Sequence, residues 1–163
     1  MPARYRRSYA PRGRRRSLVW ARASFTDNAR ATGTHKSFDL LSGYRTLGGS
    51  TQGCTIMAVH ISGAYAAASS GGNALIGLCV QPLAGISNAL PDTTDSGADW
   101  MILKAFFPQT AGATVDASTP WAIDLKSRRK CGEIQETLGL TWTPTDTGTS
   151  SLNFVSNVLL ALA

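Results

Sequence analysis

The first 22 residues of this 163-residue chain contain no aspartate or glutamate, although they hold eight of its 16 basic residues. All ten acidic residues lie further along the chain. A basic segment without acidic partners cannot neutralise its own charge, so it resists packing and attracts polyanions. The net charge of +6 therefore divides into a flexible, strongly basic arm, residues 1–17, and a nearly neutral body, residues 18–163.

The body has few charged side chains, and only four lysines occur in the whole chain. The surface of a soluble monomer is normally about a quarter or more charged. A body with so little charge is expected to bury much of its surface against other copies of itself. The alternative is a surface rich in serine and threonine that stays exposed.

Cysteine is scarce, and its number is odd. Cys54, Cys79 and Cys131 are far apart in the sequence and include no C-x-x-C pair. This spacing does not suit a disulfide framework or a zinc site. We expect three small buried side chains in a reducing compartment.

The chain has no apolar run of the 18 or more residues that a membrane span requires, so no membrane partner is expected. Leu18-Val19-Trp20 is too short for the apolar core of a secretory signal. The arginine-rich, acid-free start resembles a mitochondrial transit peptide. However, Pro2, Pro11 and Gly13 would break the helix that such a peptide needs.

Motifs of common enzymes are missing: the nucleophile elbow, the phosphate-binding loop, the dinucleotide fingerprint and the zinc-protease helix. His35 and His60 are the only histidines, and we interpret both as structural or surface residues. The sequence predicts no catalytic residues and no cofactor. Asp92, Asp95 and Asp99 share one segment that could bind a hard cation, but a solvated acidic turn is favoured, so no metal site is predicted.

Short apolar stretches separated by turn residues are the main signal for secondary structure. Loops are expected at 27–33, 84–98 and 109–120, and the last two are expected on the exterior. In Thr55–Ser62 both faces are largely apolar, so this strand is expected to be covered on both sides. The predicted fold is all-β, a single eight-stranded jelly roll or β-sandwich without helices of normal length. Its strands are expected near 18–25, 38–41, 55–62, 75–80, 100–107, 121–125, 138–142 and 152–163.

The arm carries the strongest functional signal. Arginine guanidinium groups bind phosphates in a forked geometry, and tyrosine and tryptophan stack on the bases of single strands. Such contacts do not depend on base sequence and weaken with salt. Tyr5, Tyr9 and Trp20 are the candidate stacking residues. The candidate phosphate contacts are Arg4, Arg6, Arg7, Arg12, Arg14, Arg15, Arg16 and Arg22.

A second basic cluster follows the predicted strand near 121–125. It consists of Lys126, Arg128, Arg129 and Lys130. These side chains could contact phosphates, or they could lie in solvent and pair with Glu133 and Glu136. Both interpretations stay open, and the four residues are candidate nucleic-acid contacts.

Several segments resemble coat proteins of small icosahedral viruses. MPARYRRSYAPRGRRR is similar to the arms of capsid proteins from circovirus-like, Rep-encoding single-stranded DNA viruses. SLVW, TIMAVHISG and NALIGLCVQPL are similar in layout to coat proteins of satellite RNA viruses, and IDLKSRRKCGEIQETLGLTW resembles a late-strand segment of the small DNA virus capsids. The resemblance implies a jelly-roll subunit in a T=1 shell of about 60 copies, with the arms directed inward onto a single-stranded genome.

The function expected from arm and body together is that of a structural capsid protein, not an enzyme. It would assemble with itself and package a single-stranded genome, DNA rather than RNA. It would occur in the virion, and in the host nucleus or cytoplasm during assembly, where its arm could engage nuclear import receptors. The alternatives are a satellite RNA virus coat protein, a cellular nucleic-acid-binding β protein such as a ribosomal protein, or an enzyme with a targeting presequence.

Overall fold

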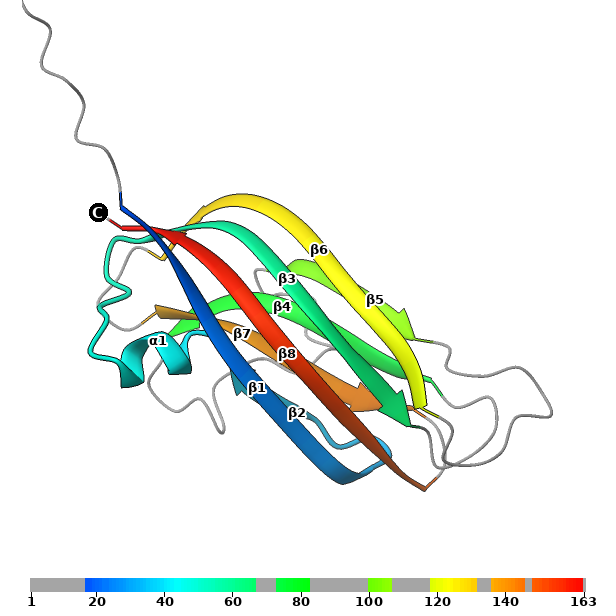
Figure 1. Cartoon of the computed structure of the whole chain (residues 1–163). Helices are drawn as coiled ribbons and strands as arrows, with labels where there is room; N and C mark the ends of the chain where they lie inside the picture. Colours follow the sequence, from blue (N-terminus) through cyan, green and yellow to red (C-terminus); the bar gives the residue numbers. More distant parts are fainter. Residues whose placement is uncertain are drawn as a thin grey trace, which may run out of the picture.

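The structure of the chain is a computed structural model that describes residues 17–66, 73–82, 100–106, 118–131, 136–145 and 148–162. Within these ranges it contains eight strands and one short helix (Figure 1). The elements in chain order are β1 Leu18–Ala31, β2 Lys36–Asp39, α1 Ser42–Thr46, β3 Thr55–Ala66, β4 Ala74–Pro82, β5 Trp100–Phe106, β6 Ser118–Lys130, β7 Glu136–Pro144 and β8 Thr149–Ala161.

The strands form two antiparallel sheets of four, in the orders β1-β8-β3-β6 and β2-β7-β4-β5. Figure 1 shows the first sheet as one layer in front of the second. Six of the seven connections between consecutive strands pass from one sheet to the other, and a wrapped chain of this kind is a jelly roll. The predicted all-β, eight-stranded jelly-roll fold is confirmed.

The core lies between the two sheets, and an aromatic cluster joins them. The rings of Phe25 on β1 and Phe154 on β8 lie 5.0 Å apart, and both lie 5.2 Å from Phe38 on β2. Tyr65 and Trp142 make a second, edge-to-face contact between the sheets at 6.1 Å. These are favourable aromatic distances, so the contacts stabilise the sandwich beyond the burial of area alone.

Strand β1 is longer than the sequence predicts. The prediction that a loop begins at Asp27 is wrong, because the strand includes the first residues of the expected loop 27–33. The strand continues to Ala31, with a register shift against β8 between Asp27 and Arg30. The Asp27 carboxylate is buried and accepts hydrogen bonds from the Trp142 indole at 2.9 Å and from the Arg30 guanidinium at 2.8 and 3.0 Å. A residue typical of loops is therefore stable in a strand, because its charge is fully partnered.

The expectation that β3 is covered on both sides is also wrong. A register shift between Ile56 and Ala58 places Ile56 in the core with Val59 and Ile61. A β-bulge of this kind reverses the alternation of side chains at one point. Without the bulge, alternation would place His60 on the same face as Ile56. His60 lies on the outer face instead and is exposed.

Strand β6 extends past both of its predicted ends. It begins at Ser118, inside the expected loop 109–120, and includes the whole basic cluster 126–130, which was expected to follow the strand. Pairing with β3 from Thr55↔Lys130 to Ala66↔Ser118 supplies the backbone hydrogen bonds that extend it. The expected loop 84–98, with Asp92 and Asp95, lies outside the described residues, and so does Asp99.

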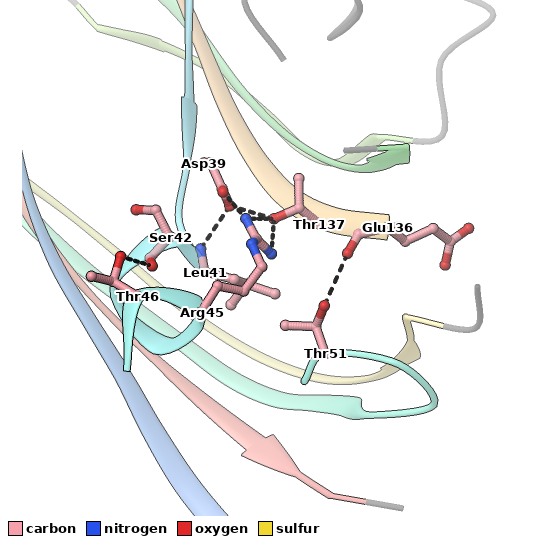
Figure 2. Close-up of polar contacts among 8 residues, drawn as sticks. All are labelled: Asp39, Leu41, Ser42, Arg45, Thr46, Thr51, Glu136 and Thr137. Carbon is pink, nitrogen blue, oxygen red and sulfur yellow. Dashed lines mark hydrogen bonds and ion pairs between the residues drawn. The ribbon is translucent and has the colours of Figure 1, made fainter. Parts of the chain in front are cut away.

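Polar contacts attach α1 to the second sheet (Figure 2). The Asp39 carboxylate at the end of β2 pairs with the Arg45 guanidinium and accepts a hydrogen bond from the Thr137 hydroxyl. The same carboxylate accepts the Leu41 amide at 3.0 Å. Arg45 also donates to the Thr137 hydroxyl oxygen at 3.3 Å, so helix, β2 and β7 are joined by one cluster.

The prediction that the three cysteines are buried is confirmed, and all three are free thiols. Cys54 and Cys131 lie at adjoining ends of β3 and β6, where the Cys131 amide donates to the Cys54 carbonyl at 2.9 Å. The hydrogen bond that the Cys131 thiol shares with Cys54, together with burial, raises the pKa of Cys131 well above the ordinary thiol value.

Candidate nucleic-acid interface

The candidate site is the outer face of the β1-β8-β3-β6 sheet at the end where β1 begins. Alternation along the strands separates this face from the core: Ala21 and Val59 are buried, whereas their neighbours Arg22 and His60 are exposed. The Leu162 amide donates to the Ser17 carbonyl at 2.8 Å, so the start of β1 lies beside the end of β8 (Figure 1). Ser17, the first described residue, therefore lies at this corner.

Register places four polar residues in one row across this face. Arg22 on β1 is opposite Asn157 on β8, Asn157 is opposite His60 on β3, and His60 is opposite Asp124 on β6. The His60 ring nitrogen Nδ1 lies 2.5 Å from the Asp124 carboxylate. The row therefore spans the full width of the sheet.

Basic side chains lie at both edges of the same face. Arg22 is exposed on edge strand β1, and Lys126, Arg128 and Lys130 are exposed on edge strand β6. Among the described residues, no carboxylate forms an ion pair with any of these four. We call these four residues the basic face, and their unneutralised charge favours the binding of phosphates.

An aromatic hollow adjoins the basic face. Trp20 is 53% exposed, and its ring lies 5.7 Å from the His60 ring at an interplanar angle of 42°. Trp20, Arg22, His60 and Asn157 line a depression of about 480 Å³. A second depression of about 430 Å³ lies at β6 and is lined by Met57, Lys126, Ser127 and Arg128.

The structure brings part of the predicted nucleic-acid site together. Arg22, Lys126 and Arg128, which are far apart in the sequence, share one face of one sheet. Arg129 is exposed too, at the position opposite the buried Ile56. The remaining candidates lie outside the described residues: Arg4, Tyr5, Arg6, Arg7, Tyr9, Arg12, Arg14, Arg15 and Arg16.

Sequence reasoning did not include His60 and Asn157 in the site. His60 was interpreted as a structural or surface residue, and Asn157 was not singled out. Alternation alone could have placed each of them on the solvent side of its strand. The register that sets them beside Arg22 and Trp20 depends on long-range pairing and has no local signal.

No group of three or more histidine, cysteine or acidic side chains suited to a metal ion occurs in the described ranges. Across the same ranges, no helix has both the length and the apolar character needed to cross a membrane.

No protein-family model matches the chain, and no curated protein matches it in sequence. Several solved structures resemble it in fold at low identity. A chain from the structure of the empty head of turnip yellow mosaic virus is 12% identical, with 100% of this chain and 90% of that chain aligned and a TM-score of 0.47. The protein from Desmodium yellow mottle tymovirus is 11% identical over 99% of this chain and 90% of that chain, with a TM-score of 0.46.

A chain of the capsid asymmetric unit of cyanophage Pam1 is 12% identical over 100% of both chains, with a TM-score of 0.41. At such identities a similarity concerns the fold alone. The function of this chain has to be argued from its own residues.

Proposed function

We propose that this chain is the coat protein of a small icosahedral virus, which assembles with copies of itself and packages a single-stranded genome. The proposed shell is of the T=1 type with about 60 copies, and the proposed genome is DNA. The observation that carries the proposal is the place where β1 begins. The seven arginines of residues 1–17 precede Leu18 in the chain, and Ser17 lies at the corner where the basic face starts.

Charge supports nucleic acid as the ligand. The residues of the basic face have no carboxylate partner among the described residues, and the arm has no acid of its own. A polyanion that neutralises the arm could continue directly onto the sheet. The outer face of the β1-β8-β3-β6 sheet would then be the inner surface of the shell.

Sparse charge in the body supports self-assembly. Leu18, Trp20 and Leu47 are large apolar side chains with 61%, 53% and 87% of their surface exposed. Arms with about eight positive charges each would repel one another until a polyanion screens them. Assembly and packaging are therefore coupled, and many weak arms on one shell hold the genome with high avidity. The proposed locations are the virion and, during assembly, the host nucleus or cytoplasm, where import receptors could bind the arm.

Light scattering after size-exclusion chromatography tests the proposal, with and without a single-stranded oligonucleotide in low salt. We expect particles of megadalton mass that form or grow in the presence of the oligonucleotide, with closed shells in negative-stain images and nucleic acid protected from nuclease. A chain that stays monomeric and binds the oligonucleotide one to one would instead be a cellular binding protein. A chain that does not bind it at all would contradict both functions.

A further inference from the structure

We infer that the hollow lined by Trp20, Arg22, His60 and Asn157 is a binding site for one unpaired nucleobase of the single strand. The inference rests on the proposed function and deepens it. The arm and the basic face need to contact only phosphates, whereas this site would contact a base. It concerns residues of the folded body.

The size and exposure of the hollow suit a ligand. Its volume of about 480 Å³ lies within the range of roughly 300–1,000 Å³ that small-molecule sites occupy. Trp20 forms one wall, yet 53% of its surface is exposed. A tryptophan ring that the core leaves uncovered retains an apolar, electron-rich surface on which a planar base can stack.

The position of the rings decides where a base can lie. The centroids of the Trp20 and His60 rings are 5.7 Å apart, which is already a contact distance for two aromatic rings. A third ring cannot enter between them. The base must therefore stack on the exposed surface of Trp20, with His60 supporting the indole from β3.

Polar groups around the hollow match a nucleotide better than an apolar partner. The Asn157 side-chain amide offers a donor and an acceptor, the combination that base edges present in return. Asp124 binds Nδ1 of His60 and thus leaves the other ring nitrogen for a ligand. Arg22 follows Trp20 by two residues on the same face of β1 and can bind the phosphate of the same nucleotide.

The single-stranded nucleic acid has a continuous path across the sheet. Register places Trp20, Leu159, Ala58 and Lys126 in one row, in that order, from β1 to β6. Three strand spacings of about 4.8 Å separate the first from the last, roughly 14 Å in all. A single strand that leaves the arm at Ser17 can place a base on Trp20 and phosphates near Lys126 and Arg128.

The test compares two probes on the full-length protein. One is a single-stranded oligodeoxynucleotide, and the other is a backbone of the same length and charge without bases. Their affinities at matched salt are measured for the wild type, Trp20→Leu, Trp20→Phe and Leu18→Ala. Leu18→Ala is the matched control, because Leu18 is exposed on the same strand but does not line the hollow.

Trp20→Leu is expected to weaken binding of the base-containing probe by roughly 10-fold while the affinity for the abasic probe stays unchanged. Trp20→Phe should keep most of the preference for the base-containing probe over the abasic probe, and Leu18→Ala should keep all of it. The inference is overturned if Trp20→Leu retains the full preference for bases, which would then come from the arm. It is also overturned if Trp20→Leu alters only particle mass, which would make Trp20 a contact between subunits. Failure of the wild type to bind the abasic probe at all would contradict the proposed function itself.

Discussion

Asp27 shows how one buried carboxylate can hold two sheets in place. It lies on β1, accepts the indole N–H of Trp142 from β7, and is also held by the Arg30 guanidinium. Its side chain is 6% exposed, so water cannot replace a lost partner. Removing one partner of a buried, hydrogen-bonded charge leaves the others unsatisfied.

We predict that Asp27→Ala lowers the free energy of unfolding by about 3 kcal/mol. Urea unfolding followed by tryptophan fluorescence measures the change. Asp124→Ala is the control, because its ion pair with His60 is exposed and contributes about 0–1 kcal/mol. Equal stability of the two variants would mean that the buried cluster has no structural role.

The thiol pair of Cys54 and Cys131 makes stability depend on pH. Thiols of the unfolded chain lose their protons above about pH 8.5, whereas the raised pKa of Cys131 keeps its proton bound in the folded state. Through Cys131 the folded state holds more protons than the unfolded state above this pH, so the free energy of unfolding falls as pH rises. The hydrogen bond to Cys131 lowers the pKa of Cys54, which acts in the opposite direction below the ordinary thiol pKa and not above it. The stability is fully present below about pH 8.5 and decreases above it.

We therefore expect the urea midpoint to fall as pH rises above about 8.5, and Cys131→Ala to flatten that decline. Cys79→Ala is the control, since Cys79 is buried away from the pair on β4. An equally steep decline in Cys131→Ala would show that another group titrates.

At the scale of elements, strands β3 and β8 approach closely at Gly63. A Cβ atom there would come 2.1 Å from the Asn153 carbonyl oxygen and 2.6 Å from the Phe154 Cβ atom. Backbone atoms cannot move aside as a flexible side chain can, so even a methyl group overpacks the site.

Gly63→Ala is predicted to destabilise the protein by about 3 kcal/mol in thermal or urea unfolding. For comparison, Gly33→Ala meets no atom within 4 Å and carries only the backbone strain of a φ of +70°. That strain costs about 1 kcal/mol. If Gly63→Ala were the milder change, the close approach of β3 and β8 would be wrong.

The contribution of the basic cluster on β6 to nucleic-acid binding can be tested through the salt dependence of the affinity. Each phosphate contact on a single strand contributes about 0.7 to the slope of log affinity against log salt concentration. Lys126→Gln should reduce that slope by about this amount. Lys36→Gln, which removes the same charge from β2 in the other sheet, should leave the slope unchanged. Identical effects of the two variants would mean that only net charge matters.

Element by element, the sequence predicts the interior better than the edges. In the predicted strand 152–163, strict alternation marks one face, and its residues Phe154, Val158 and Leu160 are buried in the core. The length of β1, the bulge in β3 and the start of β6 were not predicted, since each depends on a partner strand distant in sequence. For the same reason the basic residues of β1 and β6 could be named, but not placed on one face of one sheet.

At the scale of the whole molecule, the arm and the folded body are expected to act independently. We predict that replacing Arg14, Arg15 and Arg16 with alanine leaves the thermal midpoint of the body unchanged, because all three precede Leu18, where β1 begins. Particles of this variant should contain less nucleic acid, measured by the ratio of absorbance at 260 and 280 nm. Wild-type nucleic-acid content would show that the arm does not hold the genome.

The pairing of Leu18 with Ala161 has a practical consequence for the proposed particle. A peptide appended after the last residue would emerge at the same corner as the arm and share its compartment. In a closed shell an epitope at that position should be hidden from antibodies, and in dissociated subunits it should be accessible. The same geometry would let a small enzyme fused there be enclosed as cargo, with the outer surface of the particle unaltered.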